Sequence, residues 1–209
     1  MSSRIAKKLG SVGAGRLMAA FFEALRNKIL QVIYGFDPWH VTGNFHARPY
    51  KADVVKLIES VPHECVVEIG VGLGDILGRV SAPTRLGIDR DPQVLKAARF
   101  CVNGSVSFAV ADFASPDQLV AACRTCGITK IDVLVLVNWI HMIDIETIEA
   151  TMHALSKSIS LRHIVMDTIR TGTPGYRFTH GADDLRRLGQ IEQTIAADDV
   201  RDLVLIRVS

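Results

Sequence analysis

The chain has 209 residues, of which 48% are hydrophobic and 22% charged, and its formal net charge is +2. These values predict one globular domain with enough apolar material for an α/β core, and they exclude a disordered chain. The nearly neutral balance argues against nucleic acid as a partner. No apolar run reaches the about 18 residues of a membrane-spanning helix, and the first residues lack the apolar core of a secretory signal.

The four cysteines favour a reducing location. Cys65 and Cys101 fall in apolar stretches, as buried free thiols do, and Cys123 and Cys126 form a single C-x-x-C pair. A zinc site needs a second pair or nearby histidines, which this sequence does not offer. We therefore expect a cytoplasmic protein that holds no metal.

Residues 1–34 predict an amphipathic helix. Leu17, Phe21, Leu25 and Ile29 recur at four-residue steps and form one broad apolar face. The basic residues of the segment are Arg4, Lys7, Lys8, Arg16, Arg26 and Lys28, and its acidic residue is Glu23. We expect the apolar face to pack on the domain or on a second copy in a homodimer. Peripheral contact with the inner face of an anionic membrane is the alternative.

The segment that follows is rich in aromatic and basic side chains. Pro38 and Gly43 make it irregular, and a helix is predicted over 51–59. Six such side chains are dense for a linker: Trp39, His40, Phe45, His46, Arg48 and Tyr50. We interpret residues 1–47 as a helical arm with a lid, and residues 48–209 as the main domain.

The stretch VVEIGVGLGD, residues 66–75, is the strongest signal in the chain. An apolar strand that ends in an acid, Glu68, is followed by Gly70, Gly72 and Gly74, a pattern that predicts a sharp turn into a helix over 75–81. Glycines leave bare backbone against which a ligand can lie. Asp89 ends the next apolar run and can accept hydrogen bonds from a ribose diol. Together these features predict a nucleoside-containing cofactor at the carboxyl ends of two parallel strands.

Strands and helices alternate through the rest of the domain. Strands are predicted over 65–69, 84–89, 105–110, 131–137 and 162–168, and helices over 92–100, 116–126 and 144–157. Residues 190–197 and 200–208 predict a terminal hairpin joined by Asp198 and Asp199, so one of these strands must run antiparallel. The fold class is α/β, with a Rossmann-like, seven-stranded, mostly parallel sheet covered by helices on both faces.

The glycine spacing distinguishes between cofactors. It is G-x-G-x-G followed by Asp75, and an anionic side chain is a poor neighbour for the pyrophosphate of a dinucleotide. A cationic ligand fits better. The stretch E-x-G-x-G-x-G resembles the first motif of the class I methyltransferases that use S-adenosylmethionine, and Asp89 matches the acid at the end of their second strand. A nicotinamide or flavin fold, or a glycine turn without a ligand, are the alternatives.

This resemblance implies further contacts to S-adenosylmethionine, whose product is S-adenosylhomocysteine. Asp112 would bond the adenine amino group and Phe113 would flank the ring. Asn138 would line the methionine part, where many members of the family carry an acid instead. The remaining candidate contacts to the cofactor are Arg90, Arg48, which could pair with its carboxylate, and Tyr50.

Methyl transfer to a hydroxyl needs aligned reactants and a base. His141, just beyond the fourth predicted strand, is our first candidate for the base, with Asp167 and His180 in reserve. Trp39 and His40 in the lid, and Tyr176 and Arg177 in the loop after the fifth strand, are the expected acceptor contacts.

The short motifs FDPWH and RPY resemble motifs of bacterial methyltransferases that act on cell-surface polysaccharides. This narrower resemblance implies O-methylation of a sugar hydroxyl on a surface polysaccharide or its precursor. The alternatives are a small-metabolite O-, N- or C-methyltransferase and a non-catalytic methyltransferase-like subunit that binds partners.

Overall fold

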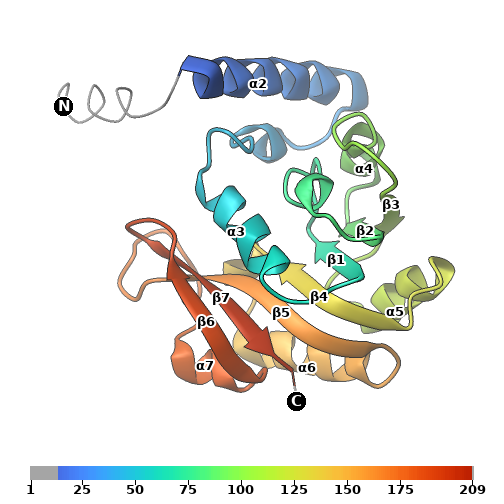
Figure 1. Cartoon of the computed structure of the whole chain (residues 1–209), viewed down its shortest axis with the longest axis vertical. Coiled ribbons are helices and arrows are strands. Elements are labelled where there is room, and N and C mark those ends of the chain that lie inside the picture. Colours follow the sequence, from blue (N-terminus) through green and yellow to red (C-terminus); the bar gives the residue numbers. More distant parts are fainter. Residues whose placement is uncertain (1–13, 209) are drawn as a thin grey trace.

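A seven-stranded sheet forms the centre of the structure, a computed structural model that describes residues 14–208 (Figure 1). The strands are β1 (Cys65–Ile69), β2 (Thr84–Asp89), β3 (Ser107–Val110), β4 (Lys130–Leu136), β5 (Ser160–Ile169), β6 (Gln190–Ala196) and β7 (Arg201–Arg207). They lie in the order β3-β2-β1-β4-β5-β7-β6. The first five are parallel, whereas β7 is antiparallel to both of its neighbours, β5 and β6. The expected Rossmann-like sheet with a C-terminal antiparallel hairpin is therefore confirmed.

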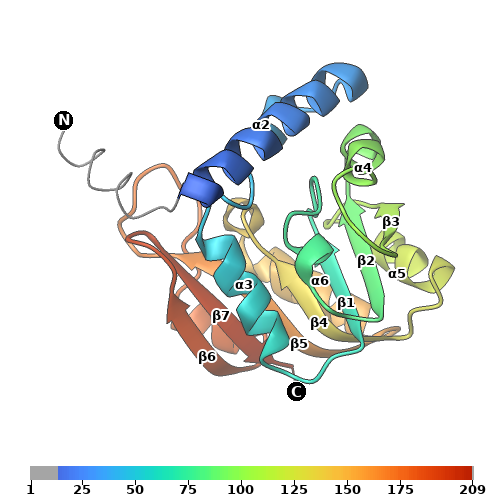
Figure 2. The ribbon, with the colours of Figure 1, turned by 45° about the horizontal axis from the view of Figure 1, so that its top comes forward.

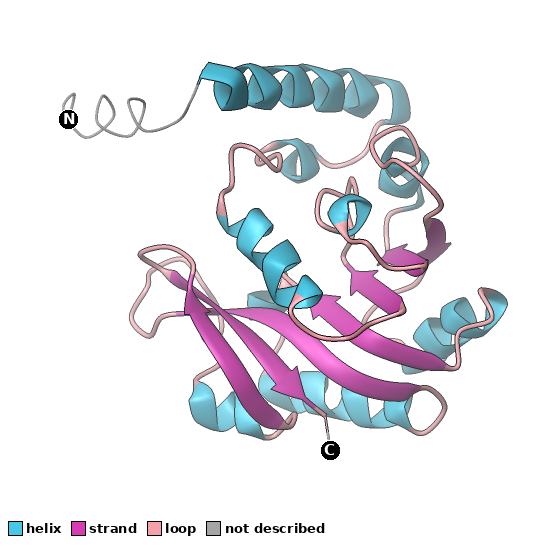
Figure 3. Ribbon diagram, viewed as in Figure 1, coloured by secondary structure: helices cyan, strands magenta, loops and turns pink. Residues whose placement is uncertain are grey.

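Helices cover both faces of the sheet (Figure 3). They are α2 (Ala14–Tyr34), α3 (Tyr50–Glu59), α4 (Pro92–Ala98), α5 (Pro116–Thr125), α6 (Ile145–Ser156) and α7 (Ala182–Arg186), with the 3-10 helices η1 (Pro38–Val41), η2 (Leu77–Arg79) and η3 (Ile140–Met142). Side-chain caps fix where some of them begin. Asp91 accepts the backbone N–H of Gln93 at 2.8 Å ahead of α4, and Asp144 accepts that of Thr147 at 2.8 Å ahead of α6. None of the described helices is long and apolar enough to cross a membrane.

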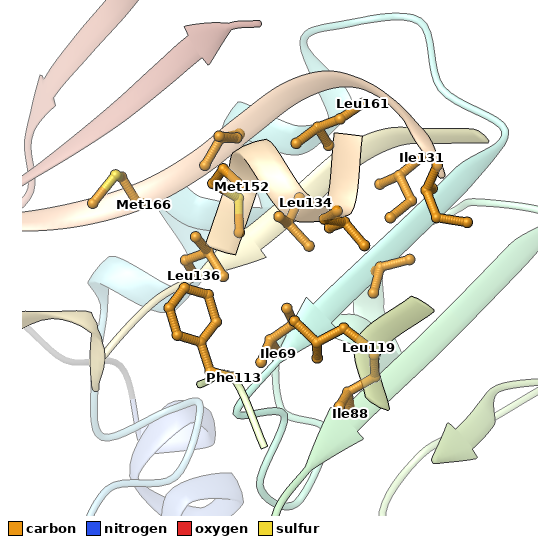
Figure 4. Close-up of a cluster of buried hydrophobic side chains, with 14 of the residues drawn as sticks. Ile69, Ile88, Phe113, Leu119, Ile131, Leu134, Leu136, Met152, Leu161 and Met166 are labelled. Atoms are coloured by element: carbon orange, nitrogen blue, oxygen red, sulfur yellow. The ribbon is translucent and has the colours of Figure 1, made fainter. Parts of the chain in front are cut away.

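Two apolar cores lie on opposite faces of the sheet, and β4 contributes to both. Leu134 and Leu136 belong to the core that α5 and α6 cover, part of which Figure 4 shows. Val133 and Val135 belong to the other core, which α3 and α4 cover. Successive side chains of a strand point to opposite faces, so a stretch buried on both sides, such as residues 133–136, is apolar on both.

The glycine turn is where the local structure differs most from the sequence expectation. The helix expected over 75–81 is only the three-residue η2, and the chain is extended again at Val80. Gly74 and Gly78 pack so closely on Val102 that a Cβ at either position would collide with its side chain. Glycine is also a poor helix former. Close packing at this turn therefore replaces a regular helix.

Helix α2 lies across the edge at which the parallel strands end, and it contacts α4 and η1 (Figures 1 and 2). Asn27 and Gln31 are buried on its inner side, whereas Phe21 and Phe22 are exposed on its outer side. The expectation that its apolar face packs on the chain's own domain is therefore wrong. The second copy and the membrane remain predictions. The rest of the predicted helical arm, residues 1–13, lies outside the described residues.

Candidate functional site

A cavity of about 500 Å³ opens where β1, β2, β3 and β4 end. Ligands of open α/β sheets bind at this edge. The sequence-predicted site residues that line it are Trp39, His40, Arg48, Glu68, Gly70, Gly72, Asp89, Arg90, Asp112, Phe113 and Asn138. The fold thus gathers the lid segment and the ends of four strands around one space.

The glycine turn after β1 forms one wall of the cavity. Gly70 has a φ of +71°, which favours glycine, and a Cβ there would overlap Nε1 of Trp139. That indole donates to the backbone carbonyl of Ile69 at 2.7 Å. Gly74 packs against Val102 and is not part of the lining. Gly70 is therefore needed for close packing within the protein as well as for the cavity lining, whereas Gly74 contributes to the packing alone.

Asp89 lies buried at the end of β2. Its Oδ2 accepts the backbone N–H of Gly72 at 3.0 Å, and its Oδ1 accepts that of Asp91 at 3.0 Å. A carboxylate has about four acceptor positions, so two remain for ligand hydroxyls. His40 covers Gly72 from the lid, since a Cβ on that glycine would lie 3.2 Å from Nδ1 of His40. Burial lowers the pKa of His40, and the negative charge of Asp89 opposes this shift.

Glu68 is buried at the end of β1, and one of its oxygens accepts the backbone N–H of Leu77 at 3.0 Å. Burial raises the pKa of Glu68 to about 8, although this N–H and the ammonium of Lys51 oppose the rise. A positive charge placed in the cavity would favour the ionised carboxylate. Glu68 therefore suits a cationic ligand.

Replacing Glu68 with glutamine is expected to change how stability depends on pH. The pKa of Glu68 is about 8 in the folded protein against an ordinary value of 4.5, so its protonation favours the folded state at low pH. That contribution is complete below the ordinary pKa and is lost as pH rises through the folded pKa. Urea unfolding should show Glu68→Gln more stable than the parent at pH 8.5, by roughly 2–4 kcal/mol, with little difference at pH 4.5. Glu64→Gln, which changes an exposed glutamate just before β1, is the control. Parallel pH profiles for parent and Glu68→Gln would contradict the assignment.

Lys51 is a cavity residue that sequence reasoning missed. It is buried in the first turn of α3, where its Nζ donates to Asp75 at 2.6 Å and to the carbonyl of Gly43 at 2.8 Å. Its third N–H remains available to a ligand carboxylate. The signal in the sequence was its place directly after the motif RPY, at the first position of the helix predicted over 51–59.

A buried network holds Asn138 at the end of β4. The backbone N–H of Asn138, whose φ is +81°, donates to Asp167 at 3.0 Å, and its side-chain oxygen accepts the hydroxyl of Tyr50. Arg201 pairs with Asp167, donates to Asn138 at 3.3 Å and stacks 4.3 Å from the ring centroid of Tyr50. Tyr50 and Asp167 therefore support the lining from behind it. Sequence reasoning missed Arg201.

The adenine end of the predicted site lies beside β3. Phe113 is buried and meets Trp139 edge-on, with ring centroids 4.9 Å apart. Asp112 is exposed, and one of its oxygens accepts the backbone N–H of Ala114 at 2.9 Å. Its second oxygen is available to a ligand. Trp139 is the aromatic member of this wall that the sequence reading left without a role.

The predicted catalytic and loop residues lie apart from the lining. His141 packs edge-on against Tyr176 with ring centroids 4.8 Å apart. Burial, helped by Arg201 and His180, lowers the pKa of His141 to about 4. His180 is buried, with Nε2 3.2 Å from the carbonyl of Ile140, and with Arg177 it lines a smaller hollow of about 250 Å³.

Acidic groups outnumber basic ones around the main cavity. Its lining carries the carboxylates of Asp37, Asp75, Asp89, Asp91 and Asp112, together with the carboxyl group of Glu68, whose pKa of about 8 leaves it mostly protonated at pH 7; the cations are Arg48, Lys51 and Arg90. A cleft with low-dielectric walls that carry charges of mainly one sign concentrates ligands of the opposite charge. The cavity is therefore suited to a ligand with positive charge and a few hydroxyl groups.

No family model and no curated protein sequence matches the chain. Solved structures that share its fold include methyltransferases that use S-adenosylmethionine, at low sequence identity. The N-methyltransferase NodS from Bradyrhizobium japonicum, solved with S-adenosylhomocysteine, is 16% identical with a TM-score of 0.62 over 88% of this chain and 98% of its own. Magnesium protoporphyrin IX methyltransferase from Synechocystis, solved with S-adenosylmethionine, is 12% identical with a TM-score of 0.61 over 95% and 99%. A methyltransferase from Anabaena variabilis is 16% identical with a TM-score of 0.62 over 90% and 93%.

Proposed function

We propose that the protein is an S-adenosylmethionine-dependent methyltransferase whose cofactor occupies the main cavity. The surplus of carboxylates around the glycine turn carries this proposal, because the cofactor bears a sulfonium and an ammonium group. A dinucleotide is disfavoured, since pyrophosphate binds at a helix N-terminus and the turn leads only into the three-residue η2. The shared fold of the solved methyltransferases supports the same assignment.

The chain's own residues fit the parts of this cofactor. Asp89 would hold the ribose hydroxyls under His40, and Asp112 with Phe113 would hold the adenine. Lys51 and Arg48 supply cations for its carboxylate. When bound, the cofactor supplies a methyl group on a good leaving group. The protein is then left to align the acceptor and exclude water.

Calorimetry tests the cofactor assignment. We expect S-adenosylmethionine and S-adenosylhomocysteine to bind the parent, and Asp89→Asn to bind about 10–100-fold more weakly, because a charged hydrogen-bond acceptor is lost. Asp199→Asn changes an exposed aspartate between β6 and β7 and should bind like the parent. Binding of a nicotinamide dinucleotide instead, or equal affinities for the two variants, would contradict the proposal.

For the acceptor we propose a sugar hydroxyl of a bacterial surface polysaccharide or its precursor. The words FDPWH and RPY support it, together with Trp39, which is 47% exposed on the cavity lining where a sugar ring could stack. His141 is the proposed base, because it lies in η3 next to the lining residues Met142 and Ile143 and is neutral at pH 7. Asp167 is less suited, since it is buried in an ion pair with Arg201.

Transfer of a labelled methyl group tests both the acceptor and the base. The parent should label glycan acceptors, and His141→Gln should abolish turnover without changing cofactor affinity. His153→Gln, on the exposed side of α6, is the matched control and should be fully active. Labelling of small metabolites alone would refute the glycan acceptor, and a fully active His141→Gln would remove His141 from the mechanism.

A further inference from the structure

The apolar face of helix α2 is exposed, whereas the apolar face of an ordinary surface helix packs on the core. Its exposed apolar side chains are Leu17, Met18, Phe21, Phe22, Leu25, Ile29, Val32 and Ile33. With 3.6 residues per turn they cover an arc of roughly 160°. Among them Phe21 is 61%, Phe22 58% and Val32 77% exposed, whereas the polar Asn27 and Gln31 are buried against the domain. Continuous apolar patches of this kind mark interaction surfaces.

Charge indicates what covers this outer face. Glu23, the one acidic residue in the first 36, is turned toward the domain, where it pairs with Arg79 at 2.6 Å. Lys28 is exposed, with its Nζ donating to the side-chain oxygen of Gln31 at 2.6 Å, and Arg16 is exposed at the start of the helix, where its Nε donates to the carbonyl of His46 at 3.3 Å. Arg4, Lys7 and Lys8 precede the helix in the sequence. In a helix pair made by two copies, these cations would find no carboxylate on the described outer face. Anionic lipid headgroups would neutralise them.

We propose that α2 binds the interfacial layer of an anionic membrane, with its apolar face buried at the boundary between headgroups and acyl chains and its basic side chains among the headgroups. Its inner side contacts η1, which carries Trp39 and His40 of the cavity lining. A membrane bound by α2 would thus lie close to the cavity, within reach of an acceptor held on a lipid. Membrane binding does not depend on the proposed methyl transfer, and it can be measured without cofactor or acceptor.

Vesicle flotation of the full chain tests this proposal. We expect the protein to float with vesicles of phosphatidylcholine and phosphatidylglycerol, to bind pure phosphatidylcholine far more weakly, and to dissociate partly at high salt. Phe21→Ser combined with Phe22→Ser should weaken binding at least tenfold, because two large apolar groups leave the interface. Lys28→Ala should weaken it about fivefold. Val110→Ser removes an exposed apolar side chain elsewhere and should bind like the parent.

Two results would overturn the proposal. One is an absence of flotation with anionic vesicles. The other is a stable dimer by light scattering that the Phe21→Ser, Phe22→Ser variant abolishes, since this would assign the face to a second copy. Both phenylalanines are exposed in the described structure, so unchanged thermal unfolding of the variant will show that its effect is not misfolding.

Discussion

Replacing Arg201 with methionine is expected to lower the free energy of unfolding by about 3–5 kcal/mol, because Asp167 would be left buried without its cation. The guanidinium also donates to Asn138 and stacks on Tyr50, so the wall of the cavity should loosen. Burial raises the pKa of Asp167 and Arg201 opposes this rise. The loss should therefore be smaller at low pH, where the carboxyl group is protonated. Urea unfolding at two pH values measures both effects.

The double variant Arg201→Met, Asp167→Asn should recover much of the loss, because the amide is uncharged and its oxygen can still accept the backbone N–H of Asn138. Arg170→Met is the matched control: it breaks a half-exposed ion pair, with Asp202 at 2.7 Å, beside the same two strands. It should change stability little. If Arg201→Met and Arg170→Met lower the free energy of unfolding equally, the buried pair stabilises the fold no more than the half-exposed one.

Replacing Gly70 with alanine is expected to reduce both stability and cofactor affinity. The new Cβ would overlap Nε1 of Trp139, whose hydrogen bond to Ile69 and edge contact with Phe113 would be lost. Backbone strain, one hydrogen bond and one aromatic pair together amount to about 2–4 kcal/mol. Because Trp139 lines the cavity, cofactor binding should weaken with it. Thermal unfolding and calorimetry measure the two effects.

Gly127→Ala is the control that separates the cost of backbone strain from the cost of displacing Trp139. Gly127 has nearly the same backbone angle, with a φ of +70° against +71° for Gly70, but a Cβ there would meet nothing within 4 Å. It should lose only about 1 kcal/mol and bind cofactor normally. If Gly70→Ala behaves no worse than Gly127→Ala, then Trp139 does not depend on the bare backbone at Gly70.

The sheet could be predicted because each of its strands has a recognisable local sequence pattern. A run such as residues 133–136 is apolar on both faces, and Asp91 and Asp144 cap helices that begin within a few residues of them. The hairpin followed from the two strand-like runs on either side of Asp198 and Asp199. The exception was the stretch 75–81, where packing between Gly74, Gly78 and Val102 overrode the local expectation.

The site was predicted where a motif marks it, and missed where distant segments meet. Asp89 and Glu68 stand at the ends of strands and could be placed by that alone. Arg201 reaches Asn138 only because β7 is antiparallel to β5, which pairs residue 201 with Ile169 near the edge of the sheet where the cavity opens. Likewise, Lys51 enters the cavity through the approach of Gly43 and Asp75. No local pattern encodes either meeting.

The direction of β7 also bears on the order in which the protein matures. A ribosome releases β1, β2 and β4 well before Arg201, so the early strands can pair while Asp167 still lacks its counter-charge. Any nascent or truncated form that stops short of residue 201 would therefore pair only the five parallel strands, because β6 joins the sheet through β7, and its Asn138 would lack the support of Arg201. We expect the chain to gain the ability to bind a ligand only near the end of translation, once Arg201 has been released.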